Sequence, residues 1–145
     1  MEKLDRVYRQ IPKSTCDPNC GACCGILYPS MAEIRAVSDW LHSKGKPYKD
    51  FVMVGDCPYL MADKSCEIYP VRPFLCRILG VSQSIPCPIG KCHPAKMLNH
   101  QESSILYRDI YLKGKEKPRT EKHRKMIRPI LEEAGLLDAR LQART

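Results

Sequence analysis

The nine cysteines are the residues of this chain whose type and spacing could do chemistry. Four of them stand within nine positions, in the run CDPNCGACC, and the rest follow singly. Protein thiolates bind zinc in tetrahedral sets of four, and they also bind iron–sulfur clusters in sets of four. All nine are therefore candidate metal ligands: Cys16, Cys20, Cys23, Cys24, Cys57, Cys66, Cys76, Cys87 and Cys92.

Metal coordination explains these thiols better than disulfide bonds do. Nine is an odd number, which a closed disulfide framework cannot use up. The first 16 residues lack an apolar run of signal-peptide length, and no stretch approaches the roughly 18 apolar residues of a membrane span. We therefore expect a cytoplasmic protein without a membrane segment, in which the thiols stay reduced.

Spacing within the first run favours ligation. Cys20 and Cys23 form a C-x-x-C pair around Gly21 and Ala22, whose small side chains allow a tight turn with backbone N–H groups aimed at sulfur. The neighbours Cys23 and Cys24 are harder to place, because adjacent side chains diverge by about 100° in a helix and about 180° in a strand. They either serve two centres, or one is a ligand and the other packs in the core.

The number of thiols slightly favours two centres, since nine is two sets of four plus one. One polynuclear centre with spare buried thiols is the alternative. Zinc sites typically use two separated C-x2–4-C pairs, whereas the single ligands Cys57, Cys66 and Cys76 suit a cluster enclosed by several segments. We expect one or two iron–sulfur clusters, with 4Fe–4S favoured and zinc as the alternative. His93 is a further candidate ligand, although a loop histidine is more often exposed.

One helix is expected to cover the metal-bearing loops. Ser30 is a natural N-cap, Glu33 three residues later completes a capping box, and Gly45 suits the C-terminal end. The apolar residues that recur at helical spacing are Met31, Ile34, Val37 and Leu41.

The segments that carry the single cysteines are expected to be short. Residues 50–73 predict a hairpin around the turn ADKS, which would bring Cys57 and Cys66 together. Residues 73–80 predict about two helical turns that end at Gly80 and carry Cys76 inward. Residues 86–94 contain too much Pro and Gly for regular structure.

The fold class expected from these elements is a small α+β, metal-stabilised domain, with cysteine-rich loops and a short hairpin covered by helices. Residues 1–95 would form the cysteine-cluster domain, and residues 96–145 a helical, basic C-terminal extension. Helices are predicted near 100–114, 120–135 and 136–145, the first with Ile105, Leu106 and Ile110 on one face.

The extension carries most of the net charge of +8. From Lys113 to Arg128 there are eight Lys or Arg and two Glu, a local charge of 8 − 2 = +6. Such a run can bind nucleic acid phosphates or an acidic protein partner. It contains no aromatic residue for stacking on bases, so a solvated helical face is the simpler interpretation, and a protein partner is favoured over nucleic acid.

Three linked motifs, CGACC, CPYL and CEIYPVRPFLCR, resemble the YkgJ-type cysteine-cluster family, which is described as zinc- or iron-chelating and includes flagellin lysine N-methylases. The resemblance spans residues 16–77, and the x3 gap after Cys16 departs from the family pattern. It implies a metal centre, with iron–sulfur favoured, and no settled common activity. The matching positions are Cys16, Cys20, Cys23, Cys24, Cys57, Pro58, Leu60, Cys66, Ile68, Tyr69, Arg72, Pro73, Cys76 and Arg77.

Arg72 and Arg77 are the candidate cofactor-binding residues outside the cysteine set. A cluster with four thiolates is anionic, so these guanidinium groups could offset its charge, donate hydrogen bonds to sulfur and help to set its reduction potential. Structural salt bridges or helix-end contacts are the alternative of equal weight.

Three functions remain open at this point. The first is an iron–sulfur protein with a redox or cofactor role alongside a larger enzyme. The second is a zinc-stabilised binding module for RNA or an acidic protein. The third is a cluster-dependent, methyltransferase-like enzyme; the chain has no Gly-rich nucleotide loop, and no catalytic residue is identified.

Overall fold

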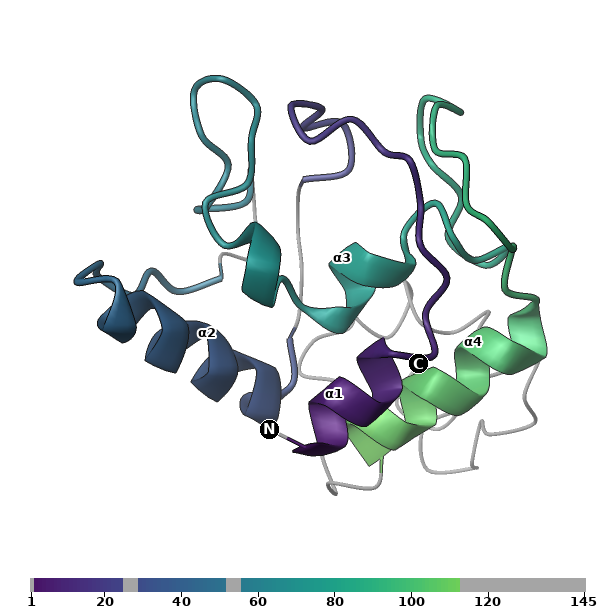
Figure 1. The fold of residues 1–145 in the computed structure, drawn as a ribbon, viewed down its shortest axis with the longest axis horizontal. Helices are drawn as coiled ribbons and strands as arrows, with labels where there is room; N and C mark the ends of the chain where they lie inside the picture. The colour runs from purple at the N-terminus through teal and green to yellow at the C-terminus, as the bar shows by residue number, and fades with distance from the viewer. Residues whose placement is uncertain (1, 25–28, 52–55, 113–145) are drawn as a thin grey trace, which may run out of the picture.

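The computed structural model describes residues 2–24, 29–51 and 56–112. Four α-helices are present there, together with one 3-10 turn and one π-helical turn (Figure 1). Figure 1 shows the helices in the lower half of the molecule and three long loops rising above them. In chain order the elements are α1 (Glu2–Tyr8), α2 (Met31–Ser43), η1 (Tyr69–Val71), α3 (Phe74–Ile78), α4 (His100–Tyr107) and η2 (Arg108–Leu112).

The helical part of the predicted fold class is confirmed, whereas the β part is overestimated. The described residues contain isolated β-bridges but no extended strand. The expected hairpin is reduced to one antiparallel bridge between Leu60 and Cys66 around a turn. The backbone bonds beside this bridge run from the Met61 N–H to the Ser65 carbonyl (2.8 Å) and from the Glu67 N–H to the Tyr59 carbonyl (2.9 Å), so the pairing ends within a few residues.

Helix α2 forms with the capping residues that its sequence predicts, but the face that it buries differs from the predicted face. Ser30 caps it, and its side chain and that of Glu33 complete a capping box; Gly45 follows the helix with φ of 66°. The buried residues are Glu33, Val37 and Leu41, whereas Met31 is 43% exposed. The predicted apolar face is therefore wrong at Met31, because a buried glutamate takes part of that face.

Glu33 connects three helices. Its carboxylate accepts hydrogen bonds from the Tyr8 hydroxyl of α1 (2.9 Å), from the Ser30 N–H (2.8 Å) and from the Phe74 N–H of α3. Burial raises the pKa of this carboxyl group, and the donors that surround it oppose that rise. A side chain that the sequence indicates only as a helix cap thus fixes the positions of α1, α2 and α3 together.

Replacing Tyr8 with phenylalanine is expected to lower the free energy of unfolding by about 1.5–3 kcal/mol, since a partly buried hydrogen bond to a carboxylate is lost. The ring remains to stack on Arg77, whose guanidinium carbon lies 3.9 Å from the ring centroid. Urea unfolding of the purified protein measures the loss. Tyr69→Phe is the matched control, because Arg72 stacks on Tyr69 at the same 3.9 Å but that ring is 43% exposed. Equal losses in the two variants would contradict the assigned role of the Tyr8 hydroxyl.

Two hydrophobic clusters hold the helices together. The larger joins α1, α3, α4 and η2, and in it the rings of Tyr107 and Tyr111 stack at 4.4 Å. The smaller packs Val37 and Leu41 of α2 against Tyr59 and Ile68. Helix α2 therefore covers the loop between Cys57 and Cys66, as predicted. The buried residues of the larger cluster are Leu4, Val7, Phe74, Leu75, Ile78, Leu98, Leu106, Tyr107, Ile110 and Tyr111.

The helix predicted near residues 100–114 is present in two parts. Asn99 caps α4 in a second capping box with Glu102, and the π-helical turn η2 follows at Arg108. Tyr107 and Tyr111 are buried, whereas Ile105 lies on the opposite side of α4 and is 42% exposed. The predicted face is therefore wrong at Ile105 and right at Leu106 and Ile110.

Residues 98–111 share one core with α1 and α3, and the boundary at residue 95 stays a prediction. The helices predicted at 120–135 and 136–145 and the basic run from Lys113 to Arg128 lie outside the described residues. Within the described ranges, no helix combines the length and the apolar character needed to cross a membrane.

Candidate metal centre

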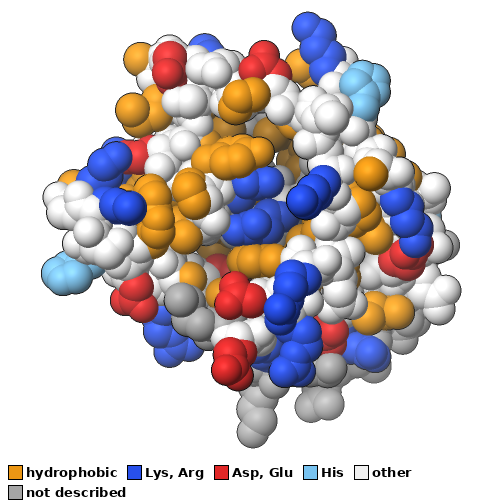
Figure 2. Space-filling model, viewed as in Figure 1, with side chains coloured by type: hydrophobic (Ala, Val, Ile, Leu, Met, Phe, Trp, Pro, Cys, Tyr) orange, Lys and Arg blue, Asp and Glu red, His pale blue; other side chains and the backbone are white. Residues whose placement is uncertain are grey.

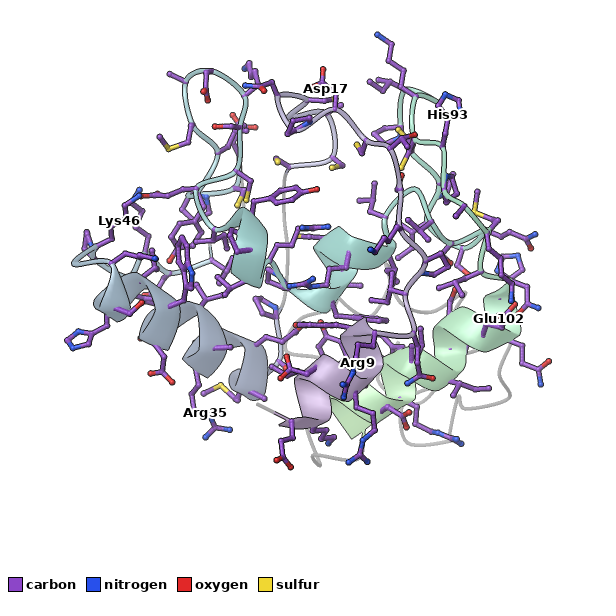
Figure 3. The ribbon with its side chains drawn as sticks, in the orientation of Figure 1. Arg9, Asp17, Arg35, Lys46, His93 and Glu102 are labelled. Carbon is purple, nitrogen blue, oxygen red and sulfur yellow. The ribbon has the colours of Figure 1, made fainter. Side chains whose placement is uncertain are left out.

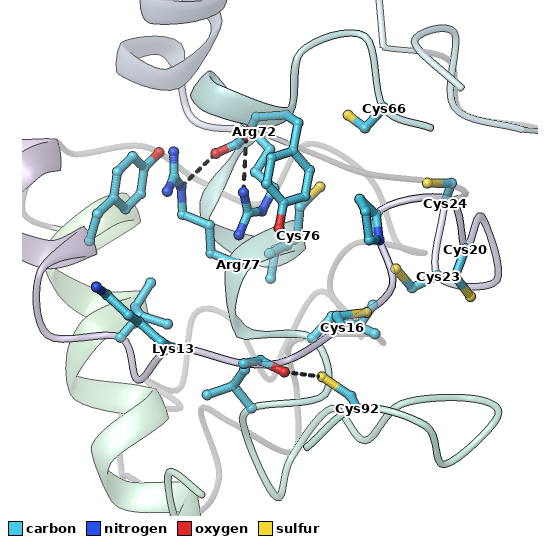
Figure 4. Close-up of a pocket in the computed structure, with 18 of the residues that line it drawn as sticks. Lys13, Cys16, Cys20, Cys23, Cys24, Cys66, Arg72, Cys76, Arg77 and Cys92 are labelled. Carbon is cyan, nitrogen blue, oxygen red and sulfur yellow. Dashed lines mark hydrogen bonds between the residues drawn. The ribbon is translucent and has the colours of Figure 1, made fainter. Parts of the chain in front are cut away.

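A single cavity of about 950 Å³ collects eight of the nine cysteines (Figure 4). Seven of the eight come from the three long loops, and Cys76 comes from α3. Residues that are up to 76 positions apart in the chain thus face one space. The cysteines that line it are Cys16, Cys20, Cys23, Cys24, Cys57, Cys66, Cys76 and Cys92.

The loop with the first four cysteines is shaped by two successive turns. The Cys20 N–H donates to the Asp17 carbonyl, and the Cys24 N–H donates to the Gly21 carbonyl, each at 3.1 Å. Gly21 lies so close to the next loop that an added Cβ would stand 2.9 Å from a Leu60 methyl carbon. A small residue is therefore needed at Gly21 because the two loops pack closely there.

Cys23 and Cys24 lie together instead of diverging. Both line the cavity, and each thiol acts on the other. Their side-chain interaction lowers the pKa of the Cys23 thiol to about 6, helped by the charge of Arg72, and raises the pKa of Cys24. Since the pair follows a tight turn, the divergence expected in a helix or strand does not apply. Neither thiol packs in the core, which corrects one of the two expectations for this pair.

One group of thiols gathers between α3 and the loop of residues 57–66. Burial raises the pKa of Cys76, and the nearby Cys57, Cys66 and Cys23 raise it further. All four cysteines line the same cavity. The N–H groups near Cys57 and Cys66 point at sulfur and oppose the effect of burial, which favours the thiolate form that a metal requires.

A second group lies where the loop of residues 13–16 runs beside that of residues 92–95. Burial, followed by the nearby Cys92, Cys23 and Cys20, raises the pKa of Cys16 to about 11. The Ser14 hydroxyl lies 2.7 Å from the Cys92 sulfur (Figure 4). This contact is one that the sequence pattern did not indicate.

Cys87 stands outside the cavity wall and beside Cys92. The backbone N–H groups of the turn after it, chiefly that of Ile89, point at its sulfur and lower the pKa of its thiol. Gly80 lies close to both cysteines, since a Cβ added to it would stand 2.8 Å from the Cys92 sulfur and 3.4 Å from the Cys87 Cβ. Cys87 therefore lies at the edge of the site, next to Cys92.

Gly80→Ala is expected to lower the free energy of unfolding by about 2–5 kcal/mol and to reduce the metal content. Gly80 has φ of 81°, which costs an L-residue about 1–2 kcal/mol, and the new Cβ would displace Cys92. Chemical unfolding and metal analysis of the same preparation measure the two effects.

Gly45→Ala is the matched control for Gly80. Gly45 has φ of 66°, but no atom lies within 4 Å of its added Cβ. We expect a loss of about 1–2 kcal/mol with unchanged metal content. If Gly80→Ala kept full metal content and matched the control in stability, the close approach of Cys92 would be irrelevant to the site.

The thiols do not converge on one point. Among the described residues, no three Cys, His, Asp or Glu side chains are arranged to hold a single metal ion. Four thiolates on one zinc ion, with Zn–S bonds of about 2.3 Å, lie within about 4.6 Å of each other. A polynuclear cluster spreads its ligands more widely, because each thiolate binds a different iron atom.

Arg72 and Arg77 have different surroundings, although their motif predicts one role for both. The charge of Arg72 acts on Cys23 and Cys66, so this residue fits the expected counter-charge. Arg77 stacks on Tyr8 and donates to the carbonyls of Arg72 (2.7 Å) and Pro70 (3.1 Å). Arg77 therefore contacts α1 and the residues before α3, and its predicted role toward a cofactor stays a prediction.

His93 does not line the cavity; its side chain is exposed at the tip of its loop (Figure 3). Its carbonyl accepts hydrogen bonds from the N–H (3.3 Å) and the hydroxyl of Thr15 (3.2 Å). The residues that sequence reasoning missed are Tyr8, Lys13 and Ser14, which line the cavity beside the cysteines. No local pattern marks them, because the packing of α1 brings them there.

The fold and the site define a small helical domain that gathers thiols around a cavity. Residues 15–102 match the model of the CxxCxxCC family, whose description is "putative zinc- or iron-chelating domain". The match spans more than half of the chain, so the chain belongs to this family, and the predicted resemblance to a cysteine-cluster family is confirmed. The relation to flagellin lysine N-methylases stays a prediction. No curated protein and no solved structure matches the chain.

Proposed function

We propose that this protein binds iron–sulfur clusters and serves a larger enzyme in a redox or cofactor role. The observation that carries the proposal is the cavity lined by eight thiols, of which no three described ones are arranged for a single ion. This arrangement favours a polynuclear centre over one structural zinc ion. The family description, which names zinc or iron, is consistent with either metal.

The residues present fit such a group. Cys57, Cys66 and Cys76, with Cys23 or Cys24, would hold one 4Fe–4S cluster. Cys16, Cys20 and Cys92, with Cys87 from the edge of the cavity, would hold a second. A bound cluster supplies one-electron transfer, with a potential set by its surroundings.

The chain itself tunes this site. Backbone N–H groups aimed at Cys57, Cys66 and Cys87 and the charge of Arg72 stabilise thiolates over thiols. The buried side chains of Ile68 and Leu75 line the cavity and exclude water from part of it. Both effects would adjust the reduction potential of a centre held here.

Analysis of iron, sulfide and zinc per chain after oxygen-free purification tests the proposal. Each 4Fe–4S cluster contributes about four iron atoms, so two filled sites give about eight per chain, with broad absorption in the visible blue. A colourless protein that holds only zinc, even after anaerobic reconstitution, would contradict it. That result would support the zinc-stabilised module instead.

The remaining expectations stay predictions. The basic run from Lys113 to Arg128 lies outside the described residues. The protein partner predicted for this run, and the less favoured nucleic acid, are therefore still predictions. Binding of a partner through this run would be sensitive to salt and would be lost when the run is deleted. A methyltransferase-like activity has no described residue that argues for it.

A further inference from the structure

The cavity extends well beyond its thiols. Its volume of about 950 Å³ lies near the upper end of the range, about 300–1,000 Å³, of sites that enclose whole small molecules. The part farther from the C-x-x-C turn is lined by α1 and the residues after it, and by α3; we call it the α1 side of the cavity. Ile11 and Leu75 give this side an apolar surface, and both pack with the larger hydrophobic cluster.

Cationic side chains are concentrated on the α1 side. Arg9, Lys13 and Arg77 line it, and Asp5 is the acidic side chain of the cavity wall there. Figure 4 shows Lys13 and Arg77 across the cavity from the turn that carries Cys20 and Cys24. In Figure 2, Lys and Arg side chains lie in a central hollow, with hydrophobic side chains above and below them.

Within the part of the chain that the structure describes, Arg77 has no acidic partner in contact, and some of its donors remain available. A guanidinium carries five N–H donors; Arg77 directs one at Nε and one at Nη2 to the carbonyls of Arg72 and Pro70, and it also interacts with the Tyr8 hydroxyl. Among the described residues, neither Arg72 nor Arg77 forms a salt bridge. The two like charges also lie near each other, which lowers the pKa of Arg77 after the larger effect of burial.

The buried Glu33 is not a contacting carboxylate partner of Arg77. Its charge acts on Arg77 at a distance, but its two oxygens already accept hydrogen bonds from Tyr8, Ser30 and Phe74. A partly buried guanidinium without a contacting carboxylate is a preorganised place for an external oxyanion, because Arg presents parallel N–H donors to carboxylate or phosphate oxygens.

We propose that the α1 side of the cavity binds the oxyanion group of a small molecule with an apolar body. Arg77 and Lys13 hold the carboxylate or phosphate, and the apolar body lies against Ile11 and Leu75. The other end of the molecule would reach the thiols. This inference deepens the proposed function and rests on it, since it gives the class of molecule that a metal centre at these cysteines would meet.

The alternative explanation is that all cationic residues offset the charge of the cluster itself. Arg72 fits that explanation, since its charge acts on Cys23 and Cys66. The groups that act most on Arg77 are Tyr8, Arg72 and Glu33, and no cysteine is among them. Lys13 and Arg77 are therefore the residues that separate the two explanations.

The test is calorimetric titration of the full chain, purified without oxygen and carrying its metal, with phenylacetate and with phenyl phosphate. Saturable one-to-one binding of at least one of them is expected. Phenylacetamide, which keeps the apolar body but has no charge, is expected to bind at least tenfold more weakly. The anion that binds identifies the oxyanion as carboxylate or phosphate.

Two variants locate the site. Lys13→Met is expected to weaken binding about threefold to tenfold, and its exposed side chain makes unfolding an unlikely complication. Arg77→Lys keeps the charge but loses the parallel donors, so a loss of about tenfold is expected. Arg35→Met on the outer face of α2 (Figure 3) removes the same charge away from the cavity and should change nothing.

Iron and sulfide are measured on the same samples. Anions that bind no better than phenylacetamide, or binding unchanged by Lys13→Met and by Arg77→Lys, would overturn the inference while leaving an iron-loaded protein and its proposed function intact. Samples without iron would instead remove the proposed function, whatever the titration shows.

Discussion

Cys76→Ser is expected to remove at least half of the iron bound per chain and the visible absorption that belongs to it. Cys76 is carried by α3 and lies near Cys57, Cys66 and Cys23, so it is the ligand best fixed by packing. A serine hydroxyl is a poor substitute for a thiolate, and the remaining three thiols would leave one iron atom without a protein ligand. Iron analysis and visible spectra of anaerobic samples measure the loss.

Cys87→Ser is the informative control for Cys76. Cys87 stands outside the cavity wall, beside Cys92, so its removal should leave the centre at Cys76 intact. If two centres exist, each variant loses the iron of its own centre and keeps that of the other. If only one centre exists, Cys87→Ser loses no iron. Circular dichroism in the far ultraviolet checks that both variants keep their helices. Full iron content in Cys76→Ser would refute the assignment of Cys76 as a ligand.

Glu33→Ala is expected to lower the free energy of unfolding by about 3–5 kcal/mol. The substitution leaves the buried donors of Tyr8, Ser30 and Phe74 without their acceptor, and each unsatisfied group costs about 1–3 kcal/mol. The capping box of α2 is lost as well. Because the same carboxylate joins α1 and α3, we also expect weaker retention of metal. Urea denaturation with a helical signal measures the change.

Glu102→Ala provides the comparison for Glu33. Glu102 has the same position in the capping box of α4, but it lies at the surface, where water replaces the lost contacts. Its loss is expected to cost about 0.5–1 kcal/mol. Similar losses for the two glutamates would show that Glu33 acts as a cap alone, without joining the three helices.

Features that depend on near neighbours in the chain were predictable. The capping box at Ser30 and Glu33 is formed within four residues, and Gly45 ends the same helix for a local conformational reason. The reversal of the chain between Cys57 and Cys66 likewise follows from a local turn. The cysteine set pointed to metal chelation because thiol chemistry is a property of residue type, and the family match agrees.

Features that depend on distant contacts were missed or misjudged. The burial of Glu33 needs Tyr8 from α1 and Phe74 from α3, which no window around α2 contains. The exposure of Ile105 depends on which face of α4 meets the core, and Tyr107 and Tyr111 fill that face instead. Likewise, the predicted hairpin pairs only at the bridge between Leu60 and Cys66.

The order of residues thus settles where α2 begins and ends and which side chains can act as soft metal ligands, since both depend on local hydrogen bonding and on atom type. Packing alone decides that Cys16 meets Cys92, that Cys76 meets Cys57 and Cys66, and that Arg72 and Arg77 face different neighbours. The reason is physical: these contacts join separate loops, and their positions are fixed only when the helices beneath bury a common apolar core.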